Sequence, residues 1–219
     1  MKKVVIAGAS GMVGGHLLDL CLNSKEIGQV VSLVRRVSGK TDPKLTELIV
    51  SDFTTYDLGA SWLKDIDIVF FCIGVYTGAA SRDEFRKITV DYPVALAKAV
   101  YGKSPEATFC LLSGSGADRS EKSRMMFAKD KGAAENRLAA IGFKAFRSFR
   151  PGYIYPVIPR KEPNFSYKLS RSLYPVLKLL GKNFSIKSTE LAQGIFNVGL
   201  KVGDLEILEN ADILKRLDS

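Results

Sequence analysis

Short apolar runs and longer segments of helical spacing alternate along the first 150 residues of this chain, and this alternation constrains its fold more than any other feature. The runs are rich in β-branched residues and lack a clean alternation of apolar and polar positions, which is typical of strands covered on both faces. They lie at Lys3 to Ala7, Val30 to Val34, Leu48 to Val50, Ile68 to Cys72, Thr108 to Leu112 and Ala145 to Phe149. Helical spacing separates them at Gly14 to Asn23, Arg82 to Tyr101 (irregular at Pro93) and Ser123 to Ala140. The order predicts an α/β fold with a doubly wound parallel sheet.

The rhythm of strands and helices stops after Phe149, and five of the eight prolines follow before Lys187. We expect residues 153–187 to form a small lid of loops and short helices over the sheet, without further strands. Beyond the lid, Ser188 and Glu190 predict the start of a helix, and residues 206–208 a last short strand. With 219 residues and 46% hydrophobic content, residues 1–219 are expected to form one domain.

Three glycines follow the first predicted strand and open the first predicted helix, in the sequence G-A-S-G-M-V-G. Small residues at such a turn let the backbone approach a pyrophosphate, which then lies against the unpaired amides of the helix N-terminus. The turn predicts a dinucleotide site on a Rossmann-type sheet, with a tight turn that binds no ligand as the alternative. The residues expected to bind the cofactor here are Gly8, Ser10, Gly11, Met12, Val13 and Gly14.

The end of the second predicted strand indicates which dinucleotide is bound. An NAD enzyme usually has an acidic residue there, about 20 residues after the glycine turn, to bind the ribose hydroxyls. This chain has Arg35 and Arg36 instead, and guanidinium groups bind a 2′-phosphate through paired, charge-assisted hydrogen bonds. NADP(H) is therefore expected over NAD(H), unless the two arginines are ordinary solvated charge.

Two further strand ends are expected to contact the cofactor. Asp52 and Phe53 follow the third predicted strand and are placed to meet the adenine. Cys72, Ile73 and Gly74 follow the fourth and are placed to line the middle of the cofactor.

Six motifs, in this order, carry a resemblance to a known family. They are G-A-S-G-M-V-G (8–14), V-R-R (34–36), F-C-I-G (71–74), L-L-S-G-S-G-A-D (111–118), F-R-P-G (149–152) and L-E-N (208–210). Over almost its whole length the chain resembles the atypical short-chain dehydrogenases/reductases, and within them the NADPH-binding oxidoreductases of the Tat-interactive-protein type, related to NmrA-like proteins. The resemblance implies hydride transfer between NADP(H) and a small carbonyl or alcohol substrate.

The resemblance also implies a catalytic set of serine, tyrosine and lysine, with the last two as Y-x-x-x-K on one helix face. The lysine lowers the pKa of the tyrosine, which gives a proton to the substrate oxygen while the nicotinamide gives a hydride. Ser113 matches the serine, with Ser115 as a second candidate, and Lys131 matches the lysine and also binds the cofactor. At the tyrosine position this chain has Phe127.

Phe127 has no proton to give. General acid catalysis contributes about 10²- to 10⁴-fold in rate, so a slow enzyme is expected unless another group or a water supplies the proton. Tyr153 and Tyr155 are the nearest candidates along the chain, and packing as ordinary aromatics is the alternative for both. The resemblance places Pro151, Gly152 and Tyr153 on the nicotinamide side of the cofactor.

The formal net charge of +9 comes from one segment, residues 144–187, which holds ten basic side chains and one acidic one. Within it, residues 164–182 set apolar side chains at helical spacing, which predicts a short basic amphipathic helix. A lid over an apolar substrate is the more economical interpretation, and contact with an anionic membrane or a protein partner is the next. No nucleic-acid partner is expected, because no nucleic-acid-binding motif accompanies the charge.

Three cysteines, Cys21, Cys72 and Cys110, form an odd number without the spacing of a metal site or a disulfide framework. We expect buried thiols, no metal and a cytoplasmic location. The apolar stretch after Lys2 and Lys3 is too short for a signal peptide, and all uncharged runs fall short of the roughly 18 residues of a spanning helix.

These features predict an NADP(H)-dependent oxidoreductase in which Phe127 replaces the family tyrosine. The competing interpretation is a catalytically silent NADP(H)-binding protein that senses redox state and signals it to a partner.

Overall fold

The computed structural model describes residues 1–76, 78–158, 181–201, 203 and 205–217, and its centre is a seven-stranded sheet. The strands run in the order β3-β2-β1-β4-β5-β6-β9, and every neighbouring pair is parallel. They are β1 (Lys2–Ala7), β2 (Ile27–Val34), β3 (Leu45–Ile49), β4 (Ile68–Phe71), β5 (Thr108–Leu112), β6 (Ala145–Arg150) and β9 (Ile207–Glu209). From β1 the chain adds β2 and β3 on one side, and then crosses back to add β4, β5, β6 and β9 on the other side. This confirms the α/β, doubly wound, Rossmann-type fold, with its order reversal between β1 and β4.

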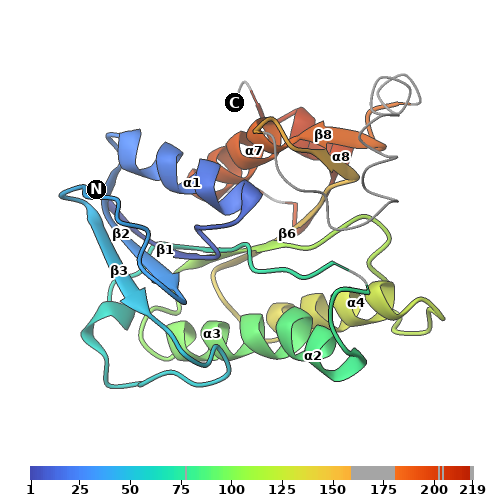
Figure 1. Cartoon of the computed structure of the whole chain (residues 1–219), viewed down its shortest axis with the longest axis horizontal. Helices are drawn as coiled ribbons and strands as arrows, with labels where there is room; N and C mark the ends of the chain where they lie inside the picture. The colour runs from blue at the N-terminus through green and yellow to red at the C-terminus, as the bar shows by residue number, and fades with distance from the viewer. Residues whose placement is uncertain (77, 159–180, 202, 204, 218–219) are drawn as a thin grey trace.

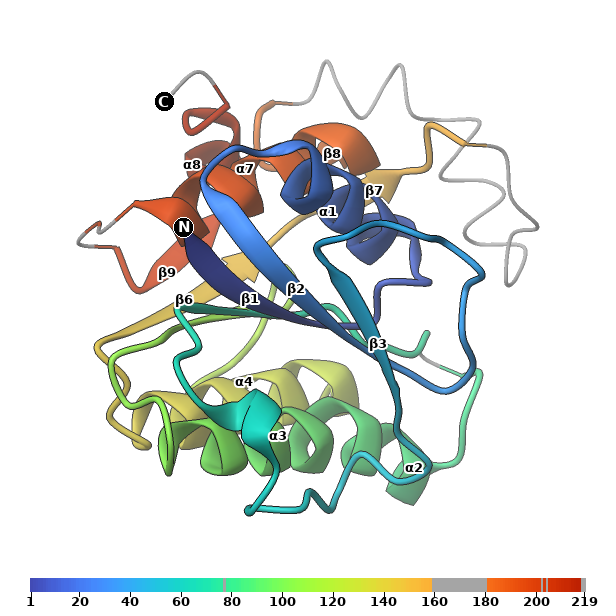
Figure 2. The ribbon, with the colours of Figure 1, turned by 90° about the vertical axis from the view of Figure 1, so that its left-hand side faces the viewer.

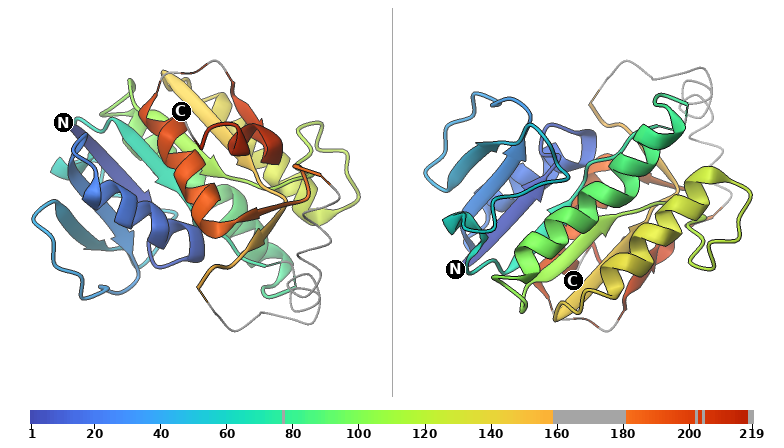
Figure 3. Two further views of the ribbon diagram at one scale, coloured as in Figure 1. Left: turned by 90° about the horizontal axis from the view of Figure 1, so that it is seen from above. Right: turned by 90° about the horizontal axis from the view of Figure 1, so that it is seen from below.

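The helices form two layers, one on each face of the sheet (Figure 1). On one face lie α1 (Met12–Asn23), α7 (Ser188–Leu200) and α8 (Asn210–Leu214). On the other lie α2 (Arg82–Arg86), α3 (Tyr92–Tyr101) and α4 (Met126–Ala139). Figure 2 shows the twist of β1, β2 and β3 between the two layers, and Figure 3 shows α1 beside α7 from above and α3 beside α4 from below.

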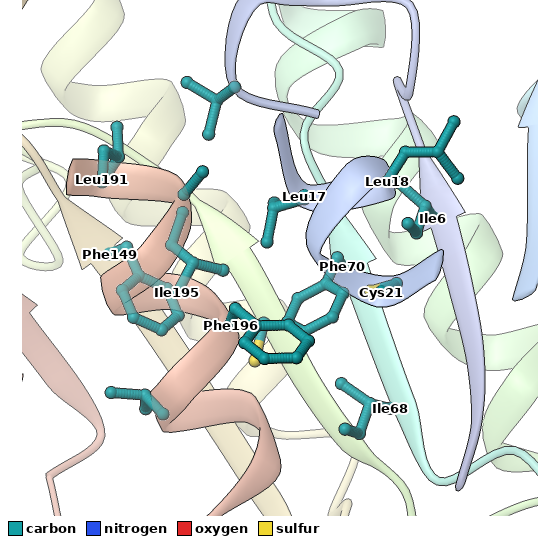
Figure 4. Packing of buried hydrophobic residues seen from close by; sticks show 14 of the residues in the cluster. Ile6, Leu17, Leu18, Cys21, Ile68, Phe70, Phe149, Leu191, Ile195 and Phe196 are labelled. Atoms are coloured by element: carbon teal, nitrogen blue, oxygen red, sulfur yellow. The ribbon is translucent and has the colours of Figure 1, made fainter. Parts of the chain in front are cut away.

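Burial on both faces explains why the strand sequences are almost uniformly apolar. In β1, Val4 and Ile6 point into the core under α1 and α7, whereas Val5 and Ala7 point into the core under α3 and α4. Figure 4 shows the first of these cores, where Phe70 of β4 packs between the two covering helices. Both cores must be filled for the sheet to be stable, and the continuous apolar runs supply both.

The helical segment before β5 contains the predicted irregularity. Helix α2 passes into a π-helical turn, Lys87–Asp91, which leads directly into α3 with Pro93 near its start. Proline has no N–H to donate to the preceding turn, and a π-turn accommodates one additional residue at such a break. The remaining short element is a 3₁₀ turn, Ser61–Leu63, between β3 and β4.

The expectation that residues 153–187 contain no strand is wrong at both ends of that segment. β7 (Tyr153–Tyr155) and β8 (Ser185–Lys187) form a separate two-stranded parallel sheet. Each strand has only three residues and its partner lies far along the chain, so no local pattern indicates the pairing. Most of the predicted amphipathic helix, residues 164–182, lies outside the described residues.

The end of the chain follows the prediction closely. Helix α7 begins at Ser188, and the amide of Lys187 donates to Glu190 Oε2 at 3.0 Å. The last strand, β9, lies one residue later than expected. Among the described residues, none of the helices combines the length and the apolar character that crossing a bilayer requires.

Candidate functional site

The glycine turn lies at the order reversal of the sheet, between the end of β1 and the start of α1. Gly8 has φ +94°, and a Cβ there would lie 2.8 Å from the carbonyl carbon of Cys72 in the loop after β4. A Cβ on Gly14 would lie 2.1 Å from the Gly8 carbonyl oxygen. The Gly11 amide donates to the same oxygen at 2.9 Å. Both Gly8 and Gly14 are therefore required for the turn to close this tightly.

The N-terminus of α1 is arranged to accept an anion. Its N-cap, Gly11, has no side-chain cap, and the first turn contains no acidic residue. The first amides of a helix have no partner within the helix and carry a partial positive charge. The turn therefore offers exposed main-chain donors that could bind a phosphate group.

Arg35 and Arg36 follow β2 and are both exposed. Neither forms an ion pair or a hydrogen bond with another described residue. The loop that they begin is attached to two neighbouring elements. Lys40 pairs with Asp19 of α1, and the Ser38 amide donates to Glu47 Oε2 of β3 at 2.8 Å. Both guanidinium groups are thus available to a ligand.

Asp52 and Phe53, in the loop after β3, differ in which of their groups a ligand could contact. Thr54 donates to Asp52 Oδ1 from its amide at 2.9 Å and its hydroxyl at 2.8 Å, and these bonds hold the pKa of Asp52 below its usual value. Asp52 also borders a hollow of about 320 Å³ that Tyr56 and Trp62 help to line. The Phe53 ring is buried against Tyr92, so only the main chain of Phe53 can face a cofactor.

The loop after β4 completes the cofactor side of the sheet. The Cys72 amide donates to the Ala7 carbonyl at 2.8 Å, which holds this loop against the glycine turn. Burial raises the pKa of the Cys72 thiol to about 12, so it stays neutral. Ile73 is half-buried and Gly74 is exposed. The three cysteines of the chain are free thiols, and no group of three His, Cys, Asp or Glu side chains suited to a metal occurs in the described part of the chain.

The structure brings together Ser113, Phe127 and Lys131 beside the ends of β5 and β6. Phe127 stands one turn before Lys131 on α4, and its ring lies near Gly116, where a Cβ would be 3.9 Å from Cε2. Lys131 Nζ donates to the Ser113 carbonyl oxygen at 2.8 Å. Burial lowers the pKa of Lys131 to about 8, while the charge of Glu135 opposes that change.

The hydroxyl of Ser113 is engaged inside the protein. Ser113 is 7% exposed, and its Oγ donates to Glu135 Oε1 at 2.7 Å. Ser115 is exposed, and its amide donates to the Pro151 carbonyl at 2.9 Å. Of the two serines, Ser115 is the one with an accessible hydroxyl.

Glu135 is fully buried in α4 and is the centre of a network that the sequence did not reveal. Its Oε1 accepts from Ser113 Oγ at 2.7 Å, Ser148 Oγ at 2.7 Å and Arg150 Nε at 3.0 Å. Its Oε2 accepts from Arg150 Nη2 at 2.5 Å and Arg119 Nε at 3.0 Å. Burial alone would raise the pKa of Glu135, but the bonds from Arg150, Ser113 and Ser148 outweigh it and hold the pKa below its usual value.

The network extends to the edge strand of the sheet. Arg150 Nη1 lies 3.1 Å from Glu209 Oε1, and Arg119 Nη1 lies 2.6 Å from Glu206 Oε1. The only hint in the sequence is that β6 reads A-F-R-S-F-R, with two arginines in a strand that is otherwise apolar. A charged residue in a buried strand requires a partner, but not one at a fixed distance along the chain.

The loop after β6 is held by Asn210, whose role the sequence also did not indicate. Asn210 is 1% exposed, and its Oδ1 accepts from the Gly152 amide at 2.9 Å. Its Nδ2 donates to the Ser185 carbonyl at 3.0 Å, which connects this loop to β8. Pro151 is buried, whereas Gly152 and Tyr153 are half-buried at the start of β7.

Comparison with known proteins agrees with this arrangement. The family model of the semialdehyde dehydrogenase NAD-binding domain matches residues 3–94. In structure, the chain is similar to a UDP-N-acetylglucosamine 4-epimerase from Methanobrevibacter ruminantium, with TM-score 0.69 and 18% identity over 94% of this chain and 74% of the other. It is also similar to Gre2 from Candida albicans, solved with NADPH, with TM-score 0.65 and 14% identity over 89% and 73% of the two chains. The fold, the glycine turn and the family model define the class: a Rossmann-type domain similar to NAD-binding domains.

Relatives in sequence narrow this class to one family. The mitochondrial protein fmp52-1 of Aspergillus terreus is 30% identical over 159 residues, which are 70% of this chain and 67% of the relative. The mitochondrial protein fmp52 of Emericella nidulans is 27% identical over 217 residues, covering 94% and 91% of the two chains. The chain belongs to the Fmp52 family.

These relatives also overturn the expected cytoplasmic location, because both are named as mitochondrial proteins. The expectation rested on reduced, unpaired cysteines. Such thiols are typical of reducing compartments in general and do not distinguish one of them from another.

Proposed function

We propose that this protein is an NADP(H)-dependent oxidoreductase of the atypical short-chain dehydrogenase/reductase type, acting on a small carbonyl or alcohol. The observation that carries the proposal is the Gly8–Gly14 turn, whose close main-chain packing and uncapped helix N-terminus fit a pyrophosphate at the order reversal of the sheet. The finer resemblance to the Tat-interactive-protein type is part of the proposal.

The choice of NADP(H) rests on Arg35 and Arg36. Both are exposed and lack partners among the described residues, and no acidic side chain follows β2 where an NAD enzyme has one. Calorimetry should therefore give a much lower Kd for NADPH than for NADH. Arg35→Ala should weaken NADPH binding about tenfold or more, the effect of losing one charge-assisted hydrogen bond, and leave NADH binding unchanged. Equal affinities for the two cofactors would reject NADP(H) selectivity.

The chain's own residues would hold the reacting groups as follows. Lys131 and the loop from Pro151 to Tyr153 would hold the ribose and the nicotinamide, and Ser115 would donate to the substrate oxygen. The bound nicotinamide supplies the hydride. Phe127 excludes water from one side of the site but supplies no proton, so the proton must come from Lys131, one of the tyrosines of β7, or water.

Turnover with a panel of aldehydes and quinones tests this assignment. NADPH consumption should be slow in the wild type and lost in Lys131→Ala. Phe127→Tyr should raise it by about 10²-fold or more, because it restores the i, i+4 tyrosine–lysine pair. Lys129→Ala, an exposed lysine on the same helix, serves as the control.

A second candidate function is a catalytically silent NADP(H)-binding sensor. Two observations favour it: Phe127 stands at the proton donor's position, and the Ser113 hydroxyl is engaged by Glu135. Tight NADPH binding without turnover in either the wild type or Phe127→Tyr would support the sensor over the enzyme.

A further inference from the structure

Ser113 joins two groups on α4 that are one turn apart. Its hydroxyl donates to Glu135 Oε1 at 2.7 Å, and its carbonyl oxygen accepts from Lys131 Nζ at 2.8 Å. Its amide donates to the Phe149 carbonyl at 2.8 Å, which ties the same residue to β6. All three polar groups of Ser113 are therefore used in holding its position.

The position of the Lys131 ammonium depends on this residue. The Ser113 carbonyl is the hydrogen-bond acceptor of Nζ, and the lysine stem lies against Gly114, where a Cβ would be 3.2 Å from Lys131 Cε. A displacement of Ser113 would thus move both the acceptor of Nζ and the neighbouring Gly114, against which the lysine side chain packs.

Glu135 is suited to prevent that displacement. Its carboxylate is fully buried and fixed by Arg150 of β6 and Arg119 of the loop after β5. On its own helix the charged group nearby is Lys131. From the edge strand and the residues before it, Glu206 pairs with Arg119 and Glu209 pairs with Arg150. A buried carboxylate with five hydrogen bonds has little freedom to move.

We propose that Glu135 is a positioning residue, which clamps the Ser113 hydroxyl and thereby fixes the carbonyl that orients the Lys131 ammonium. Glu135 is fully buried and acts through Ser113. The clamp itself is a property of the cofactor-free protein, and only its consequence for catalysis rests on the proposed function.

Ser148 provides a matched control within the same network. Its Oγ also donates to Glu135 Oε1 at 2.7 Å, and the residue is buried as Ser113 is, but its carbonyl is not the acceptor of Lys131 Nζ. Ser113→Ala and Ser148→Ala therefore remove the same bond to the same oxygen. Only the first releases from Glu135 the residue whose carbonyl oxygen accepts from Lys131.

The test measures the ionisation of Lys131 without cofactor or turnover. An amine-reactive reagent is applied from about pH 6 to about pH 10, and modification of the Lys131 peptide is followed by mass spectrometry. The wild-type midpoint is expected near 8. Glu135→Gln should lower it by roughly one unit because it removes a nearby negative charge, and Ser113→Ala should lower it by about half as much because Glu135 no longer holds the main-chain acceptor of Lys131 in place. Ser148→Ala should leave it unchanged.

Equal midpoints in Ser113→Ala and the wild type, or equal shifts in Ser113→Ala and Ser148→Ala, would overturn the proposal. If Glu135→Gln does not fold, the serine pair carries the test alone. Calorimetry with NADPH on the same variants separates the two proposals. A shift of the Lys131 midpoint without NADPH binding would retain the clamp and reject the cofactor function. NADPH binding without a shift of the midpoint would retain the cofactor function and reject the clamp.

Discussion

The loops after β1 and β5 lie on either side of β4 at the same edge of the sheet, and they are held by different interactions. The loop after β1 is fixed by main-chain contacts: Gly11 to Gly8, the Cys72 amide to Ala7, and the close approach of Gly14 to Gly8. No side-chain hydrogen bond caps the helix that follows it. This leaves its amides available for an anion.

The loop after β5 is fixed instead by buried charge. Glu135 accepts a hydrogen bond from the Ser113 hydroxyl, and Arg119 within the loop pairs with the same carboxylate. The glycine turn thus keeps the first amides of its helix free, whereas the loop that contacts Lys131 has its polar groups engaged. The following predictions test this difference.

The largest expected effect is on stability, from Glu135→Ala. The substitution leaves Arg150, which is 12% exposed, without its main partner, and leaves two buried serine hydroxyls without an acceptor. Loss of one partner of a buried ion pair costs about 3–5 kcal/mol, so the free energy of unfolding in urea should fall by that amount.

Asp130 on the same helix is the control for this prediction. It is also fully buried, but its partners Arg82 and Arg86 are 46% and 36% exposed and can turn to solvent. Asp130→Ala should therefore cost less, about 1–3 kcal/mol. A larger loss for Asp130→Ala would show that burial of the carboxylate alone, and not of its partners, decides the cost.

The next effect is a loss of cofactor binding in Gly14→Ala. The added methyl group would meet the Gly8 oxygen at 2.1 Å, so the turn must open, at a cost of about 1–3 kcal/mol in unfolding free energy and with loss of NADPH binding by calorimetry. Gly15→Ala is the matched control, because its Cβ meets nothing closer than 3.4 Å and alanine favours the helix. Wild-type NADPH affinity in Gly14→Ala would mean that the close approach is not needed.

A smaller effect concerns pH. Hydrogen bonds in the folded protein hold the pKa of Glu135 below that of an ordinary glutamate, so the stability this contributes is present above the pKa of the unfolded chain and is lost as the pH falls through the lowered pKa. The difference in unfolding free energy between wild type and Glu135→Gln should therefore shrink in acid. Other carboxylates with lowered pKa, such as Asp52 and Asp118, are common to both proteins and cancel in the difference. A difference independent of pH would contradict a lowered pKa for Glu135.

The smallest effect is expected at the surface of the cofactor side. Lys40 pairs with Asp19 across the loop that carries Arg35 and Arg36, but both side chains are about half exposed. Lys40→Ala should change the unfolding free energy by less than about 0.5 kcal/mol and leave the NADPH affinity as it is. A strong loss of affinity would show that this exposed pair fixes the arginine loop.

The glycine turn and the sheet around it could be predicted from the sequence because their requirements act on single positions. A left-handed φ at Gly8 and a close main-chain approach at Gly14 admit glycine almost alone, so the residue type reveals the geometry. Burial on both faces likewise requires continuous apolar runs, and these placed six of the seven strands of the sheet to within a few residues.

Only the tertiary structure decided how the substrate side is organised. It assigned the Ser113 hydroxyl to Glu135, left the Ser115 hydroxyl accessible, and paired β7 with β8. The partners of Glu135 stand 13 to 22 positions away along the chain. A buried carboxylate needs donors, but many residue types at many positions can supply them, so nothing in the sequence specifies which ones do.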